Sequence, residues 1–375
     1  MSDVPKFLFI DDAVNGGDAD RYWRLLDKAG ELSIEPRLPE RSELLVSEAE
    51  LPEGINGFIV DINLKDRVVE GRNRFIGTGA GLAQDLRLLQ AVNGPDGQRP
   101  RPIVRLCAAQ VFQSYLAGDD STADIFDLGF AKETIGDGVG QARQQIASLP
   151  DLYLGVIQAA GAGSARDLLG LDEVGYARLH SAFRSALEFE LTRKPHEAAS
   201  FFIRYFLESP GLLIDEALLA IRLGVNPQKS SGWELAKQRF ADAIYTGRAA
   251  HGFPRWWSDK VLGLWAHIAE MPIYRLTATE RVDLLRAAGL ESLVPIEANA
   301  YSPGNRPWLL SRSDDPALQL PADPEHAYPL TTATKPWLDE AVWCREQAKR
   351  ERRSPLLSPE TQARLARDLK RGAST

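Results

Sequence analysis

The sequence FIVD at residues 58–61 is a short apolar run that ends on a carboxylate, Asp61. Gly57 precedes it and a polar segment follows, a pattern typical of a buried strand. A second apolar run, at residues 6–10, ends on Asp11 and Asp12. Because ligands bind outside the carboxyl ends of parallel strands, we expect the three acids to meet at one edge of a sheet.

Three carboxylates at such an edge need a compensating positive charge, since like charges a few ångströms apart favour protonation. Mg²⁺ is a suitable cation because it prefers oxygen ligands and keeps several waters. With a metal offsetting the charge, an aspartate can attack phosphorus and form an acyl phosphate. The sequence therefore predicts a magnesium-dependent phosphorylation site.

The pattern around these runs predicts alternating strands and helices over the first 148 residues. Apolar residues recur at helical spacing in 18–29, and the glycine-rich GAGL at 79–82 leads into another helix. The last expected strand brings Lys132 to the same edge as the acids, where its ammonium group can neutralise a phosphoryl oxygen. We expect a five-stranded parallel, doubly wound α/β domain, with strands near residues 6–10, 32–37, 58–61, 101–108 and 125–131 and further helices near 40–50 and 110–116.

These motifs, in this order, resemble the receiver domain of two-component response regulators, whose fold is flavodoxin-like. The resemblance implies that Asp61 accepts a phosphoryl group from a phosphohistidine on a partner kinase or phosphotransfer protein. It also implies that Asp11, Asp12, Asp61 and the backbone carbonyl of Asn63 hold Mg²⁺. The phosphate contacts would be Lys132 and, at the end of the fourth strand, Cys107.

The chain departs from the receiver pattern at several positions. Cys107 replaces the usual Ser or Thr and is a weaker hydrogen-bond donor. Gly129 stands where the family has an aromatic switch residue, and Glu133 replaces the proline after the lysine. An insertion containing Arg67, Arg72, Arg74 and Phe75 follows Asp61.

Length and composition set the wider frame. With 375 residues the chain has room for two or three domains of roughly 100–200 residues each. No apolar run approaches the ~18 residues of a membrane span, and we expect a cytoplasmic protein. The two cysteines, Cys107 and Cys344, indicate neither a disulfide framework nor a zinc site. Motifs of hydrolases, P-loop proteins and dinucleotide-binding enzymes are absent, so we expect a phosphoacceptor and no turnover enzyme.

The remainder reads as two further parts. Residues 150–295 predict a mostly α-helical output or interaction domain, in which Trp256 and Trp257 are either core residues or anchors for a protein partner. Residues 296–375 predict a proline-rich strap followed by basic helices. Residues 345–375 carry nine basic and four acidic side chains, against 16 and 24 in residues 1–148. The basic run at 349–353 is either a solvated face or a contact for an acidic partner or nucleic acid.

Three functional hypotheses follow from this sequence. In the first, a phosphorylated receiver-like domain controls the helical domain, which binds an unidentified protein. In the second, the domain never takes phosphate and serves as a scaffold in a multi-protein complex. In the third, the basic tail makes the protein a nucleic-acid-binding regulator, although the acidic body argues against broad contact with nucleic acid.

Overall fold

The computed structural model describes residues 4–14, 19–39, 54–64, 77–92, 100–108, 125–133, 135–136, 138–162, 164–299, 302–313, 319–331 and 335–372. The chain packs into two compact units. Unit 1 comprises residues 1–205 and 246–253, and unit 2 comprises residues 206–245 and 254–375. The predicted insertion at 65–76 and the predicted helices at 40–50 and 110–116 lie outside the described residues.

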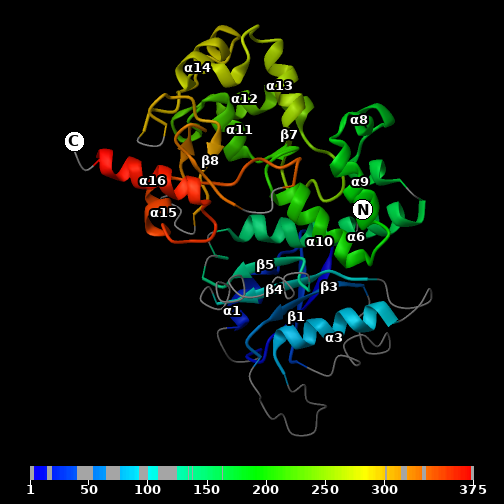
Figure 1. The fold of residues 1–375 in the computed structure, drawn as a ribbon. Helices are drawn as coiled ribbons and strands as arrows, with labels where there is room; N and C mark the ends of the chain where they lie inside the picture. The colour runs from blue at the N-terminus through cyan, green and yellow to red at the C-terminus, as the bar shows by residue number, and fades with distance from the viewer. Residues whose placement is uncertain are drawn as a thin grey trace, which may run out of the picture. The chain divides into compact units, whose positions relative to one another are not determined.

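Unit 1 is built on a five-stranded sheet in which every pair of neighbouring strands is parallel (Figure 1). The strand order is β2-β1-β3-β4-β5, the flavodoxin-like order. The two strands that carry the acids, β1 and β3, are therefore neighbours near the middle of the sheet. The strands are β1 Lys6–Ile10, β2 Ser33–Arg37, β3 Ile55–Asp61, β4 Ile103–Cys107 and β5 Leu128–Ala131.

Alternating side chains bury both faces of this sheet. Leu8, Ile10, Phe58 and Val60 pack in one cluster with residues of helix α3 Gly79–Val92. Phe7, Phe9 and Ile59 between them are also buried, and β2 contacts helix α1 Ala19–Leu26. Such runs of buried residues are expected for parallel strands covered on two sides. The predicted α/β fold class is confirmed.

Helix α6 Val139–Ala162 continues unit 1 beyond the sheet. The predicted domain border near residues 148–150 falls inside this helix, which runs through Pro150. Five further elements follow it, and α6 packs against both α7 and α10. They are α7 Ala165–Leu169, α8 Glu173–Arg178, α9 Ser181–Glu190, α10 Pro195–Phe202 and the π-helical segment Ile203–Glu208.

A buried ionic network joins α6 to the sheet. Arg87 of α3 pairs with Asp127 at 2.7 Å, and both side chains are nearly inaccessible. Tyr153 of α6 donates to Asp127 at 2.8 Å and accepts from Arg87 at 3.0 Å. Arg87 also donates to the backbone carbonyls of Ile125 and Arg101. Such a pair is tolerated in a core because its hydrogen-bonding groups are satisfied.

Unit 2 is mostly helical, as predicted for this part of the chain. Its main core cluster includes Trp233, Trp256 and Trp265. Helix α14 Ala278–Ala287 begins with a capping box formed by Thr277 and Glu280. Trp256–Trp257 form strand β7, which pairs antiparallel with β6 Leu213–Ile214. The helices are α11 Glu216–Leu223, α12 Trp233–Arg239, α13 Ser258–Ala266 and α14 Ala278–Ala287, with 3-10 turns at Pro227–Lys229, Ala241–Ala243 and Ile273–Arg275.

The region predicted as a proline-rich strap forms short antiparallel pairs. Asp323 organises it by accepting hydrogen bonds from the Ser302 hydroxyl and from the backbone N–H groups of Gly304 and Arg306. The predicted basic tail contains two helices. The elements are β8 Leu309–Leu310, β9 Pro321–Ala322, β10 Tyr328–Pro329, β11 Val342–Trp343, α15 Arg345–Arg350 and α16 Pro359–Gly372. Among the described helices of both units, none combines the length and the apolar character needed to cross a bilayer.

Candidate functional site

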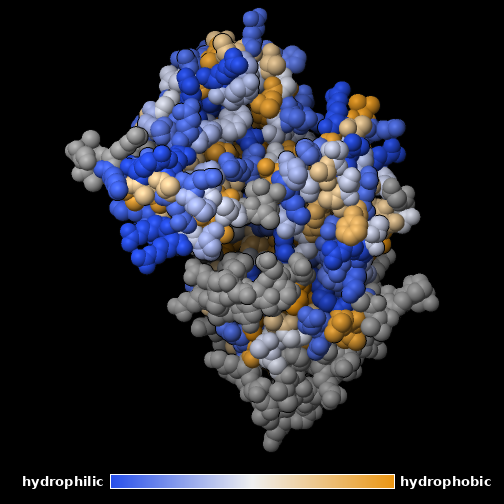
Figure 2. Space-filling view, viewed as in Figure 1, coloured by the Kyte–Doolittle hydropathy of each residue, from blue (hydrophilic) through white to orange (hydrophobic). Residues whose placement is uncertain are grey.

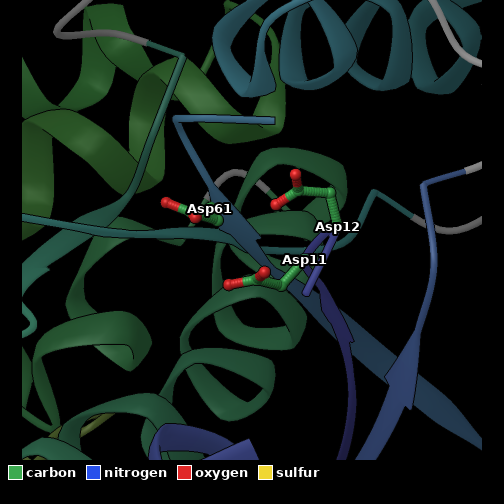
Figure 3. Close-up of side chains that lie close together, drawn as sticks. All are labelled: Asp11, Asp12 and Asp61. Atoms are coloured by element: carbon green, nitrogen blue, oxygen red, sulfur yellow. The ribbon is translucent and has the colours of Figure 1, made fainter. Parts of the chain in front are cut away.

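Three carboxylates converge at the carboxyl edge of the sheet in unit 1. Asp11 follows β1 directly and Asp61 is the last residue of β3, so adjacent strands deliver them side by side (Figure 3). One oxygen from each of Asp11, Asp12 and Asp61 lies within 4.8 Å of the others. All three residues are buried. The site lies between β1 and β3, where the strand order reverses, which is the usual position for a ligand in an open α/β sheet.

Lys132 directly follows β5, which is separated from β3 by β4, and its side chain reaches the acidic cluster. Its ammonium nitrogen Nζ lies 2.8 Å from Oδ2 of Asp61 and 3.2 Å from Oδ2 of Asp11. The backbone N–H of Lys132 donates to the carbonyl of Cys107 at 2.8 Å, which aligns the end of β5 with the end of β4. The ammonium group also lies 5.4 Å from the centre of the Tyr22 ring on α1, a cation–π arrangement.

The charges of Asp11, Asp61 and Lys132 act on one another. Burial raises the pKa of Asp61, the Lys132 ammonium opposes that rise, and the Asp11 carboxylate adds to it. Burial opposes the charge on Lys132, yet Asp61 and Asp11 outweigh burial and raise the pKa of the ammonium group. The pKa of Asp61 and the pKa of Lys132 are both raised for one reason. Two carboxylates share one lysine, so both stabilise its charge, while it cannot fully neutralise either of them.

Short local hydrogen bonds orient two of the carboxylates. Oδ1 of Asp11 accepts the N–H of Ala13 at 2.8 Å, and Oδ1 of Asp61 accepts the N–H of Asn63 at 3.3 Å. Both are the turn type that aspartate forms with its own backbone two residues on. In each case the second oxygen, Oδ2, contacts Lys132. Each of these two aspartates therefore forms a local turn through one oxygen and contacts the lysine through the other.

The remaining predicted residues of this site lie close by. Cys107 is buried at the end of β4. Burial raises the pKa of its thiol, and the charges of Asp61 and Lys132 also act on that pKa. Asn63 lies two residues past β3, and its N–H group already contacts Asp61.

Gly79 and Tyr22 shape the site without having been predicted as site residues. The N–H of Gly79 donates to the carbonyl of Ile62 at 3.0 Å, which joins the start of α3 to the end of β3. A Cβ atom on Gly79 would lie 1.9 Å from the carbonyl oxygen of Asp61. The GAGL motif at 79–82 was the available signal for Gly79. The helical stripe on which Tyr22 lies gave no reason to single out that ring.

The donor set fits a hard divalent cation. Three carboxylates offer oxygen ligands within a small space, and the Lys132 ammonium group contacts two of them. Mg²⁺ binds through carboxylates together with water. Asp11, Asp12 and Asp61 could therefore hold such an ion.

Trp256 and Trp257, predicted as core residues or partner anchors, are 5% and 3% exposed. The ring of Trp257 packs against Phe206 and Tyr245, with ring centres 5.6 Å and 5.8 Å away. A partner can use an aromatic ring as an anchor only where the ring is accessible. The burial favours the core interpretation.

Comparison with known proteins gives no family for this chain. No family model and no curated protein matches it. Among solved structures, one similar chain is a fusion that contains the trimeric coiled coil of yeast Spc42. The identity is 16%, the TM-score is 0.25, and the match covers 50% of this chain and 91% of that one. At that TM-score the likeness carries no argument. What holds is the fold, a flavodoxin-like α/β unit with an acidic cluster at its carboxyl edge.

Proposed function

We propose that residues 1–148, the part of unit 1 that contains the sheet, form a receiver-like domain that accepts a phosphoryl group on Asp61 and thereby controls the helical residues 150–295, which bind a protein partner. The observation that carries this proposal is the contact of the Lys132 ammonium group with both Asp61 and Asp11, at 2.8 and 3.2 Å. Three acids and one lysine at the carboxyl edge of a parallel sheet supply an acceptor, cation ligands and a phosphate contact.

We assign the acceptor role to Asp61 because it stands where the receiver resemblance places the acceptor, at the end of β3, and because its Oδ2 lies 2.8 Å from the Lys132 ammonium group, against 3.2 Å for Asp11. An oxygen of the Asp61 carboxylate forms a bond to phosphorus, the bond from phosphorus to the donor breaks, and the donor leaves with that electron pair. Lys132 then pairs with a phosphoryl oxygen. Bound Mg²⁺, held by Asp11, Asp12, Asp61 and the carbonyl of Asn63, would supply positive charge beside the incoming phosphoryl group.

The natural donor for such an acceptor is a phosphohistidine on a histidine kinase or phosphotransfer protein. The domain accepts one phosphoryl group per cycle, and we assign no enzymatic turnover to it. Among the described residues of unit 2 we assign no catalytic set. The helical region is accordingly assigned the output role, with an unidentified protein as its partner.

The second candidate is a phosphorylation-independent scaffold in a multi-protein complex, and the departures at Cys107 and Gly129 favour it. The Cys107 thiol is buried and is a weak hydrogen-bond donor, whereas the family's switch uses a hydroxyl group there. Gly129 in β5 has no side chain that could rotate when the site changes. These features weaken propagation of a signal more than acceptance of a phosphoryl group.

A nucleic-acid role rests on the basic tail. Lys349, Arg350, Arg352 and Arg353 are exposed, and the surface over α15 and α16 is mostly hydrophilic (Figure 2). Such charges contact phosphates in a salt-dependent way. Loss of salt-dependent DNA or RNA binding on deletion of residues 345–375 would support this role.

Intact mass spectrometry tests the leading proposal. The full chain is incubated with Mg²⁺ and acetyl phosphate, and we expect wild type to gain the mass of one phosphoryl group. Asp61→Asn should gain nothing. Asp167→Asn is a matched control, because the Asp167 side chain is 71% exposed in the same unit, and it should behave as wild type. No labelling of wild type would favour the scaffold, and equal labelling of Asp61→Asn would overturn the assignment of Asp61 as the acceptor.

A further inference from the structure

Tyr22, on helix α1, presents its ring to the ammonium group of Lys132, and the proposed function gives this ring no role. The centre of the ring lies 5.4 Å from Nζ, inside the roughly 6 Å over which the face of an aromatic ring attracts a cation. Tyr22 is half-buried, and the side chain of Lys132 is 17% exposed. The attraction is stronger where water is excluded, so these surroundings favour the contact.

Within the described residues, the ammonium group of Lys132 has three contacts. It donates to Asp61 at 2.8 Å and to Asp11 at 3.2 Å, and the ring of Tyr22 is the third. Both carboxylates belong to the candidate Mg²⁺ site, so their partners change when a cation binds or when Asp61 takes a phosphoryl group. The ring is neutral, and its attraction for the ammonium group depends on neither event.

The helix that carries Tyr22 is fixed to the rest of unit 1. Helix α1 contacts β2 and α6, and its last residue, Leu26, is fully buried. Arg143 of α6 donates from Nε to the backbone carbonyl of Leu25 at 3.2 Å and pairs with Glu31 at 3.0 Å. The Arg143 side chain is 14% exposed. The ring of Tyr22 is therefore presented from an anchored element, which is what a group that positions another one requires.

We propose that Tyr22 is a positioning residue for phosphoryl acceptance, whose ring holds the Lys132 ammonium group beside Asp61 while the carboxylates change partners. This inference rests on the proposed function. As the phosphoryl group reaches Asp61, Lys132 exchanges a carboxylate oxygen for a phosphoryl oxygen and keeps its contact with the ring. No bond to Tyr22 forms or breaks. Without the ring, the ammonium group has to be immobilised during the reaction itself, which slows the transfer.

Rates of labelling by acetyl phosphate and Mg²⁺ test this inference on the full chain. Tyr22→Phe keeps the ring and should react within about twofold of wild type, whereas Tyr22→Leu should react about three- to tenfold more slowly. Phenylalanine with one, two or three ring fluorines at position 22 is the sharper series. Fluorine withdraws electrons from the face of the ring at nearly constant size, so the rate should fall with each fluorine.

NMR of the full chain gives a readout that needs no phosphoryl group. With lysine labelled with ¹³C at Cε, the signal of Lys132 is assigned by its loss in Lys132→Met. A methylene group beside the face of an aromatic ring resonates upfield of an ordinary lysine. We expect this upfield shift in wild type and in Tyr22→Phe, and its loss in Tyr22→Leu. In wild type it should persist when Mg²⁺ is added, because the ring keeps the ammonium group.

Tyr176→Leu is the matched control, because Tyr176 is a half-buried tyrosine of α8 whose ring lies 5.8 Å from the Arg184 guanidinium group in the same unit. It should be labelled at the wild-type rate. The inference is overturned if Tyr22→Leu reacts as fast as wild type, if fluorination leaves the rate unchanged, or if Mg²⁺ abolishes the upfield shift. A wild-type chain that takes no label would instead refute the proposed function, and this inference with it.

Discussion

Lys132→Met should destabilise unit 1 by removing the ammonium group that Asp11 and Asp61 share. Those two side chains are 2% and 7% exposed, so the variant leaves both carboxylates buried without that cation. At an effective dielectric constant of about 20, attractions across 2.8 and 3.2 Å are roughly 6 and 5 kcal/mol. Most of this gain is offset by the cost of burying Lys132, so we expect a net loss of about 3 kcal/mol, the lower end for breaking a buried pair.

Hydrogen exchange at the amides of β1 and β3 measures this loss where it arises. A change of about 3 kcal/mol corresponds to exchange roughly 150-fold faster at pH 7. Lys6→Met is the matched control, because Lys6 begins β1 and its ion pair with Glu35 leaves both side chains 31% exposed. An exposed pair contributes about 0–1 kcal/mol. If Lys132→Met exchanges no faster than Lys6→Met, the reasoning about the charge cluster is refuted.

The same variant has a defined pH dependence. Burial and Asp11 raise the pKa of Asp61, and Lys132 opposes that rise, so its removal raises the pKa further. Between the ordinary carboxyl pKa of about 4 and the raised pKa of folded Asp61, the folded chain binds more protons than the unfolded chain. The free energy of unfolding therefore falls as the pH rises through this range. The deficit should therefore shrink toward pH 4, and Mg²⁺ should reduce it at pH 7. A deficit independent of both would contradict this explanation.

Two further substitutions test the frame of the site. Gly79→Ala should lower the free energy of unfolding by about 2–3 kcal/mol and weaken metal binding, because its Cβ would lie 1.9 Å from the carbonyl oxygen of Asp61. The control is Gly81→Ala, whose Cβ would meet nothing closer than 3.6 Å. It should be neutral in urea unfolding. Arg87→Met should cost about 3–5 kcal/mol, since it strands the buried carboxylate of Asp127, and an unfolding midpoint equal to that of wild type would contradict the role assigned to the network.

Much of unit 1 follows from its sequence because the signals are local. Short apolar runs ending on Asp11 and Asp61 define strands, and parallel strands bring their carboxyl ends together whatever lies between them. Lys132 follows from the same rule applied to β5. Strand order needs no side-chain detail, so the acidic cluster and its lysine could be placed before any coordinates.

Features that depend on packing between distant segments could not be predicted in this way. The Arg87 and Asp127 pair joins residues forty positions apart, and no local pattern marks either as buried. We expected a domain border near residues 148–150, yet helix α6 continues across it and through Pro150. Trp256 and Trp257 lie in a part of the chain predicted as mostly helical, but pairing with β6 makes them a strand.

The most direct measurement of the central claim is to trap and locate the phosphoryl group. An aspartyl phosphate is reduced by borohydride to homoserine, so a chain treated with Mg²⁺ and acetyl phosphate, then reduced and digested, carries a residue-specific mark. We expect homoserine at position 61, absent when Mg²⁺ is chelated. Homoserine at another aspartate, or none at position 61 with Mg²⁺ present, would contradict the account.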